Sequence, residues 1–107
     1  MLNVKLCQAD ESAARPDRST VRAYFHVTAA SDPGLLPRLI EPVSKLGHVP
    51  DRVHASRESG DGSQMVVDLR LSGVTTRTAE LIGFALRAIV GVGHVIAVVE
   101  PDGGSRA

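Results

Sequence analysis

The side chains of this 107-residue sequence with the clearest capacity for chemistry are its histidines, and their spacing decides what they can do. No two of them have the HxxxH or HExxH spacing that places two imidazoles on one helical face for zinc. His26 and His54 fall on predicted strands and can share one face of a sheet, but a metal site also needs a third ligand and a supporting shell. We interpret all four as solvated side chains: His26, His48, His54 and His94.

Other catalytic patterns are also missing from the sequence. The serines at 56, 59 and 63 have no GxSxG context, which a nucleophile elbow requires. Gly91-Val92-Gly93 ends a predicted helix, whereas a phosphate site places its glycines before a helix. Cys7 is the single cysteine and lies in a lead-in segment, so no disulfide or CxxC motif forms within the chain. We therefore predict that the protein is not an enzyme and has no cofactor and no metal.

One short stretch does have the chemistry of a binding site. Asp32-Pro33-Gly34 directly precedes apolar residues at helical spacing, namely Leu35, Leu36, Leu39, Ile40, Val43 and Leu46. Asp32 can cap the helix, Pro33 suits the first helical position, and Gly34 lets another molecule approach closely. Free N–H groups and the helix dipole favour an anion there, such as an amino-acid carboxylate. The alternative, that these residues are only a good helix start, stays open.

The same predicted helix, residues 33–46, contains three prolines, Pro33, Pro37 and Pro42. A proline inside a helix removes a backbone bond and typically costs about 3 kcal/mol. We expect a short or kinked helix that is held by packing of its apolar residues and ends at Gly47.

The composition bounds the class of protein. The chain is 43% hydrophobic, which is enough for one modest core, and its 12 basic and 12 acidic residues cancel. A zero net charge argues against nucleic-acid binding, which needs clustered Lys and Arg. The apolar runs are too short to span a bilayer, and the N-terminus becomes charged too soon for a signal peptide. We expect a cytoplasmic protein that binds neither membrane nor nucleic acid.

The remaining pattern alternates strands and helices. We predict strands at 21–29, 49–57, 64–71 and 94–100, with helices at 33–46 and 76–90. This βαββαβ order predicts an α+β, ferredoxin-like fold: a four-stranded antiparallel sheet with two helices on one face. The open face would carry Arg22, Tyr24, His26, Arg52, His54, Asp68 and Arg70. Residues 1–19 are predicted as a flexible arm, 20–100 as the domain and 101–107 as a tail.

The stretch DPGLLPRLIEPVSKLGHVPDRV, on this βαββαβ pattern, resembles an ACT domain. Within that family the chain is most similar to the small regulatory subunit of acetolactate synthase (acetohydroxyacid synthase). The finer resemblance rests on KLGHVPDRVHAS at 45–56 and ALRAIVGVGHVIAVVE at 85–100. The similarity covers roughly residues 20–100, essentially the whole predicted domain.

The resemblance implies a non-catalytic regulatory domain. ACT domains often pair as homodimers and bind an amino acid between the loop after the first strand of one chain and the second strand of the other. By position, the implied ligand-binding residues are Asp32, Gly34, Leu35 and Leu36 in the loop, and Val49, Pro50 and Asp51 facing it. The implied effector is valine, leucine or isoleucine. The implied partner is a catalytic subunit, possibly that of acetolactate synthase in branched-chain amino acid biosynthesis.

The chain departs from this pattern before its second strand. Val49 stands where these regulators often carry Asn, and Pro50 cannot donate a ladder hydrogen bond. These residues favour a second interpretation, a ligand-free ACT-like dimerisation and protein-interaction module that regulates another metabolic enzyme. A third interpretation is a small enzyme that uses His26 or His54, because this architecture hosts many unrelated functions.

Overall fold

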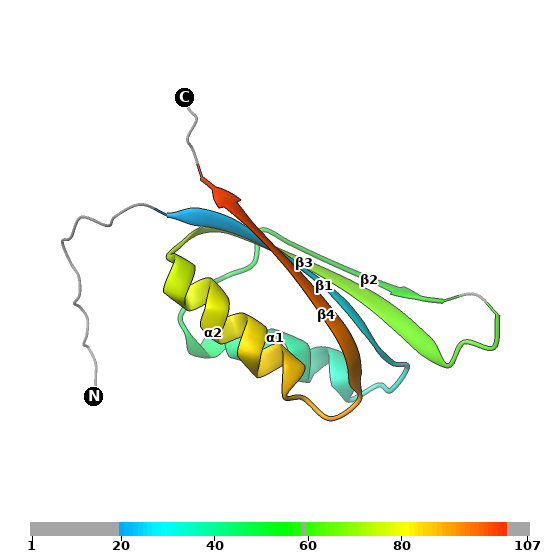
Figure 1. Ribbon diagram of the computed structural model, residues 1–107. Helices are drawn as coiled ribbons and strands as arrows, with labels where there is room; N and C mark the ends of the chain where they lie inside the picture. Colours follow the sequence, from blue (N-terminus) through cyan, green and yellow to red (C-terminus); the bar gives the residue numbers. More distant parts are fainter. Residues whose placement is uncertain (1–19, 59, 103–107) are drawn as a thin grey trace.

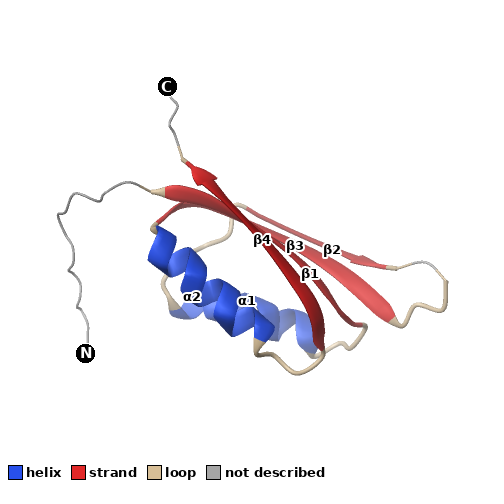
Figure 2. Ribbon diagram, viewed as in Figure 1, coloured by secondary structure: helices blue, strands red, loops and turns tan. Residues whose placement is uncertain are grey.

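The four strands form one antiparallel sheet, and both helices lie against the same face of it (Figures 1 and 2). The computed structural model describes residues 20–58 and 60–102. The elements are β1 (Val21–Ala30), α1 (Leu35–Lys45), β2 (Arg52–Arg57), β3 (Gln64–Val74), α2 (Thr76–Arg87) and β4 (Val92–Pro101). The strand order is β2-β3-β1-β4. The predicted α+β, ferredoxin-like βαββαβ fold is therefore confirmed. The predicted arm at 1–19 lies outside the described residues.

The core lies between the helices and the two central strands. Period-2 alternation turns one side of β1 and β3 toward the helices, and 3.6-residue periodicity turns one stripe of each helix toward the sheet. The buried side chains are Ala23, Phe25, Val27 and Ala29 of β1, Leu35, Leu39 and Val43 of α1, Met65, Val67, Leu69, Leu71 and Val74 of β3, and Ala79, Ile82 and Leu86 of α2. Alternation in the sequence predicts inward-facing residues on the first and third strands, namely Val21, Ala23, Phe25, Val27 and Ala29, and Met65, Val67, Leu69 and Leu71. All of them are buried in the core except Val21, which is half-buried.

The edge strand β2 is exposed along its whole length, whereas Val92 and Val95 of the other edge strand, β4, are partly buried against the core. Alternation in the sequence predicts that Val53 and Ala55 of the second strand point inward. They pair with Leu69 and Val67, which places them on the helix side as predicted. Neither is buried, however, and Val53 keeps 41% of its surface exposed. The expectation that these two residues enter the core is wrong, because the helices cover the central strands and not this edge. The backbone groups along the outer edge of β2 therefore stay free to pair with another strand.

Helix α1 accommodates its prolines unequally. Pro33 precedes the helix, which begins at Leu35, and Pro37 is the third helical residue, where an N–H would have no intrahelical partner. Pro42 alone lies inside the helix and removes a backbone bond. The expected penalty at Pro37 is therefore absent. The helix ends as predicted, because Gly47 has a φ of 83° and donates its N–H to Ser44 O at 2.9 Å.

Helix α2 begins with a side-chain cap. The sequence offers Thr75 or Thr76 as the cap, and in the structure Thr75 Oγ1 accepts the N–H of Thr78 at 3.1 Å. The helix ends at Arg87, three residues before the predicted end, and Gly91 then turns the chain with a φ of 102°. No helix in residues 20–58 and 60–102 is long and apolar enough to cross a membrane.

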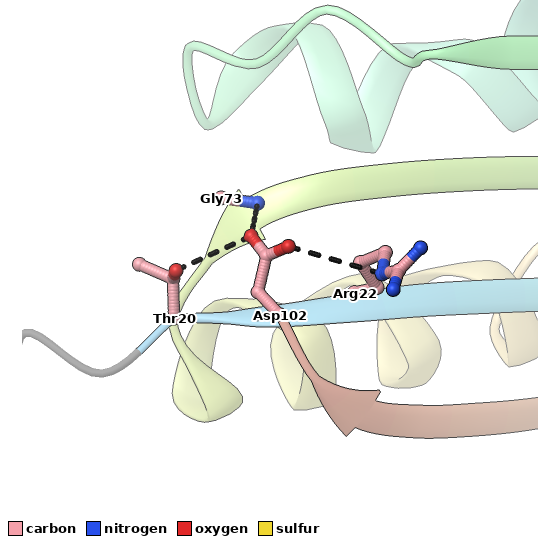
Figure 3. Close-up of polar contacts among 4 residues, drawn as sticks. All are labelled: Thr20, Arg22, Gly73 and Asp102. Carbon is pink, nitrogen blue, oxygen red and sulfur yellow. Dashed lines mark hydrogen bonds and ion pairs between the residues drawn. The ribbon is translucent and has the colours of Figure 1, made fainter. Parts of the chain in front are cut away.

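Asp102 ties together the ends of three strands (Figure 3). Its Oδ2 accepts the N–H of Gly73 at 3.0 Å and the hydroxyl of Thr20 at 3.3 Å, and its Oδ1 lies 3.8 Å from Arg22 Nε. The pairing of β1 with β3 is irregular between Val21 and Ala23, and Gly73 has a φ of 67° there. The carboxylate thus satisfies a backbone N–H at a bulge that interrupts the ladder.

Replacing Pro42 with Ala restores an interior helical bond, so we expect the free energy of unfolding to rise by about 1–2 kcal/mol. Pro37→Ala is the matched control, because its new N–H gains no helical partner and should add little. Urea denaturation of both variants measures the difference, and equal effects at the two positions would contradict this account.

Removing the Asp102 carboxylate with Asp102→Ala leaves the Gly73 N–H without its acceptor, and we expect a loss of roughly 1–2 kcal/mol in the free energy of unfolding. Asp102→Asn keeps an oxygen acceptor and should lose less. Thermal denaturation of the two variants checks this, and an Ala variant as stable as the natural protein would show that the carboxylate does not hold the strand ends.

Candidate functional site

The loop between β1 and α1 is folded by Asp32. Its Oδ1 accepts the N–H of Gly34 at 3.0 Å, and its backbone carbonyl accepts the N–H of Leu35 at 3.0 Å. This arrangement is an Asx turn followed by a tight entry into the helix. The N-cap residue is Gly34, and no side chain caps the helix there. The prediction that Asp32 caps the helix is therefore wrong, since its carboxylate bonds two residues ahead instead.

The two hydrogen bonds to Asp32 reduce the number of backbone N–H groups that the loop can offer to a ligand. The sequence predicts that the N–H groups of Gly34 and Leu35, at the start of the helix, hold a carboxylate. In the structure each of them already donates to Asp32. The second residue of a helix has no intrahelical acceptor for its N–H, so Leu36 retains a free donor. A carboxylate at this loop would need a further partner.

That partner lies in a hollow beside the loop. The hollow has a volume of about 480 Å³ and is lined by Ser31, Asp32, Pro33, Leu36, Ala55, Ser56, Arg57 and Met65. One wall is the predicted loop, the opposite wall is the end of β2, and Met65 of β3 forms part of the floor. The hollow therefore places an anionic side chain, Asp32, and a cationic one, Arg57, around an apolar surface.

Arg57 is the residue of this hollow that sequence reasoning missed. It pairs with the buried Met65, so its side chain starts on the helix side of the sheet. Its Nε donates to the carbonyl of Gly62 at 3.0 Å, which positions the guanidinium and leaves its other N–H groups available. The sequence alternation could have identified it. Val53 and Ala55 point to the helix side, and Arg57 is the next residue of β2 on that same side.

The second half of the predicted site lies elsewhere in the same chain. Val49, Pro50 and Asp51 precede β2, which begins at Arg52 and not at Val49 as expected. Pro50 lacks an N–H, and the first ladder-like bond is donated by Asp51 to Arg70 O at 2.7 Å. These residues follow the C-terminal end of α1, whereas Asp32 precedes its N-terminal end. One chain alone does not bring the two halves together.

His26 and His54, the two histidines that the sequence places on one sheet face, lie close to a carboxylate in the structure. The pairing places His26 and His54 on the open face, on either side of Asp68. His26 Nδ1 lies 2.7 Å from Asp68 Oδ1, and both side chains are about half exposed. The part of the chain that the structure describes has no group of three His, Cys, Asp or Glu residues that can hold a metal ion.

Asp61, in the turn between β2 and β3, has a lowered pKa. The backbone N–H of Ser63 donates to Asp61 Oδ1 at 2.9 Å and, with the Ser63 hydroxyl, lowers the pKa of Asp61 below its ordinary value. A lowered pKa means that this turn is stabilised above the ordinary Asp pKa and loses that contribution as the pH falls through the lowered value. The group is fully exposed and belongs to the turn and not to the hollow.

Comparison with known proteins bears on the fold and the family. A sequence model of the ACT-like domain family matches residues 16–100. The structure is similar to the solution NMR structure of the ACT domain from GTP pyrophosphokinase of Chlorobium tepidum, with a TM-score of 0.60 and 14% identity over 74% of this chain and 86% of that one. At that identity the likeness shows the fold alone. No curated protein matches the chain in sequence.

The glycine of the loop gives a test of the local structure. Gly34 has a φ of −82°, and an added Cβ would meet only Asp32 Oδ1 at 3.7 Å. Gly34→Ala should therefore leave stability unchanged or raise it by about 0.4–1 kcal/mol. Gly91→Ala is the contrasting variant, because its φ is 102° and a Cβ would lie 3.2 Å from Leu35 Cδ2. We expect it to lose more than about 1 kcal/mol in urea denaturation, and the reverse order would contradict the loop geometry.

Proposed function

The chain belongs to the ACT-like domain family, and we propose that it is a non-catalytic regulatory domain that binds an amino acid as a homodimer and controls a catalytic enzyme. The observation that carries this proposal is the hollow between the β1–α1 loop and β2, with Asp32 and Arg57 in its walls. Its volume of about 480 Å³ falls within the usual range for small-molecule sites.

The hollow has the chemistry of a free amino acid. An amino acid at neutral pH carries an ammonium and a carboxylate on one carbon beside a side chain. In the proposed complex the ammonium binds the carboxylate of Asp32, and the carboxylate binds the guanidinium of Arg57 and the N–H of Leu36. The side chains of Leu36 and Met65 contact the apolar part of the ligand. This assignment moves the carboxylate contact from the Gly34 and Leu35 amides, which are already bonded, to Arg57.

A second copy would complete the site. The outer edge of β2 is free, so β2 of a partner can add to it antiparallel. With the two-fold axis at His54, Val53 lies opposite the partner's Ala55, and Arg57 lies opposite the partner's Asp51. This register brings the partner's Val49 to Asp51 beside the hollow. The proposed ligand-binding set requires such an arrangement, because it joins Asp32, Gly34, Leu35 and Leu36 of one chain to Val49, Pro50 and Asp51 of the other.

We propose a branched-chain amino acid as the effector and the catalytic subunit of acetolactate synthase as the partner. The apolar floor of the hollow suits a valine, leucine or isoleucine side chain, and the sequence resemblance at 45–56 and 85–100 favours a small-subunit-like protein. The proposal includes a domain at 20–100, with an arm before it, in a cytoplasmic protein. The predicted tail at 101–107 begins too early, because Pro101 belongs to β4 and Asp102 ties the strand ends together.

A ligand-free interaction module is the second candidate. The bonds within the loop favour it, because Asp32 already accepts the two N–H groups that were expected to meet a carboxylate. Val49 is 85% exposed and Pro50 offers no N–H donor, so neither provides a polar ligand contact from its own chain. In this case the dimer would act on its partner enzyme without an effector.

Thermal stability measured against each of the twenty amino acids at millimolar concentration tests the proposal. A ligand present at 100 times its dissociation constant stabilises the protein by roughly 2.7 kcal/mol. We expect a stabilising shift with one or more branched-chain amino acids. We expect Arg57→Gln and Asp32→Asn to abolish it, because each removes the charge that neutralises one end of the ligand.

The matched control is Arg38→Gln, an exposed arginine of α1 outside the hollow, which should keep the shift. A shift that survives both hollow substitutions would overturn the site. No shift with any amino acid, together with saturable binding to a catalytic subunit, would identify the ligand-free module.

A further inference from the structure

The open face of the sheet carries two rows of aligned side chains that the proposed effector site does not use. Strand pairing sets Arg52, Arg70, Tyr24 and Val98 in one row across β2, β3, β1 and β4. It sets His54, Asp68, His26 and Ile96 in the neighbouring row. All eight residues line a single hollow of about 330 Å³ on the face away from the helices.

One end of this hollow is cationic, and its two arginines, Arg52 and Arg70, form no ion pair with the described residues. Arg52 and Arg70 lie directly opposite each other, an arrangement that is destabilising for like charges. In residues 20–58 and 60–102 the ion pairs are Arg22–Asp102, His26–Asp68 and Lys45–Glu41, and none involves these two arginines. An anion bound at this end would offset the like charges of the aligned pair.

The one carboxylate of the two rows is already engaged. Asp68 Oδ1 lies 2.7 Å from His26 Nδ1, so this carboxylate already has a partner on β1. Arg70 is held from the other side, because its guanidinium carbon lies 5.4 Å from the centre of the Tyr24 ring. The cationic end is therefore partly ordered in advance, which lowers the entropy cost of binding an anion.

The other end of the hollow is apolar. Ile96 and Val98 of β4 expose 57% and 51% of their surfaces, and no helix covers that face. At about 4.8 Å per strand, the backbone of β4 lies roughly 10 Å from that of β3 and roughly 14 Å from that of β2. The side chain of Arg70 spans part of this distance, because its guanidinium lies over the ring of Tyr24 on β1. A hollow with a cationic end and an apolar end is complementary to a small molecule that has an anionic group and an apolar body.

We propose that the open sheet face is a second binding site, which takes a small anion with an apolar body, the anionic group between Arg52 and Arg70 and the body against Tyr24, Ile96 and Val98. The anionic group is a carboxylate or a phosphate. The volume of about 330 Å³ is at the lower end of small-molecule sites and is too small for a macromolecular groove.

This site is independent of the proposed effector site. Arg57, Asp32 and Leu36 lie on the helix side, whereas the two rows lie on the opposite side of the same sheet. Pairing of β2 with a second copy extends the sheet sideways and leaves the open face uncovered. The two sites can therefore be occupied together. An experiment that disproves one site does not bear on the other.

The test is a titration of the ¹⁵N-labelled protein, followed by the backbone amide shifts. Phenyl phosphate and phenylacetate are the probes, inorganic phosphate supplies the charge without the body, and benzyl alcohol supplies the body without the charge. We expect saturable shifts on β1, β2, β3 and β4 at the two rows with the probes, and weaker effects with each fragment. Whichever probe binds more tightly identifies the anionic group as a phosphate or a carboxylate.

Variants make the assignment specific. Arg70→Gln and Arg52→Gln should each weaken probe binding roughly threefold to tenfold, as expected for loss of one charged contact. Arg38→Gln on α1 should bind as the natural protein does. The proposal is overturned by shifts that do not saturate, by unchanged affinity in both β-strand variants, or by shifts confined to 31–36 and 55–57. Shifts on the open face that depend on protein concentration alone would instead assign it to contact between copies.

Discussion

The antiparallel pairing of β1 with β3 is the constraint on which the rest of this structure depends. It aligns Phe25 with Leu69 and Val27 with Val67 on the helix side, and Tyr24 with Arg70 and His26 with Asp68 on the other. Because side chains alternate strictly along a strand, a shift of one residue would exchange the two sets and bury the charges. The buried face and the charged face are thus two consequences of one register.

The same register positions the loop and leaves the sheet edges open. Ala30, the last residue of β1, pairs with Gln64 and donates its N–H to Gly91 O at 2.8 Å, so the chain enters the β1–α1 loop beside the start of β3. The end of β2 lines the same hollow as this loop. Asp32 then folds the loop with its side chain, and Arg57 is held by the β2–β3 turn. The hollow between them follows from two local turns on a rigid sheet, which is why polar side chains there can be held in place without being buried.

The fold could be predicted from the sequence because its signals are periodic. Alternation in 21–29 and 64–71 and helical spacing in the apolar residues after Gly34 each identify an element and its inner side, and Thr75 and Gly47 mark helix ends. Other details depend on contacts that no local pattern encodes. Asp32 could cap a helix or fold an Asx turn, and its choice depends on where the helix begins. The exposure of Val53 depends on how far the helices reach across the sheet, and the hollow depends on Arg57 and Met65 meeting a loop distant in sequence.

The central claim is that an amino acid binds in the hollow between the β1–α1 loop and β2. The measurement that tests it most directly is a map of backbone amide shifts in the ¹⁵N-labelled protein as each of the twenty amino acids is added. The account predicts that at least one of them, with a branched apolar side chain, causes saturable shifts at 31–36 and 55–57, and also at 49–51 contributed by a second copy. If all twenty leave those amides unmoved, or if the shifts fall on other surfaces, the claim is contradicted.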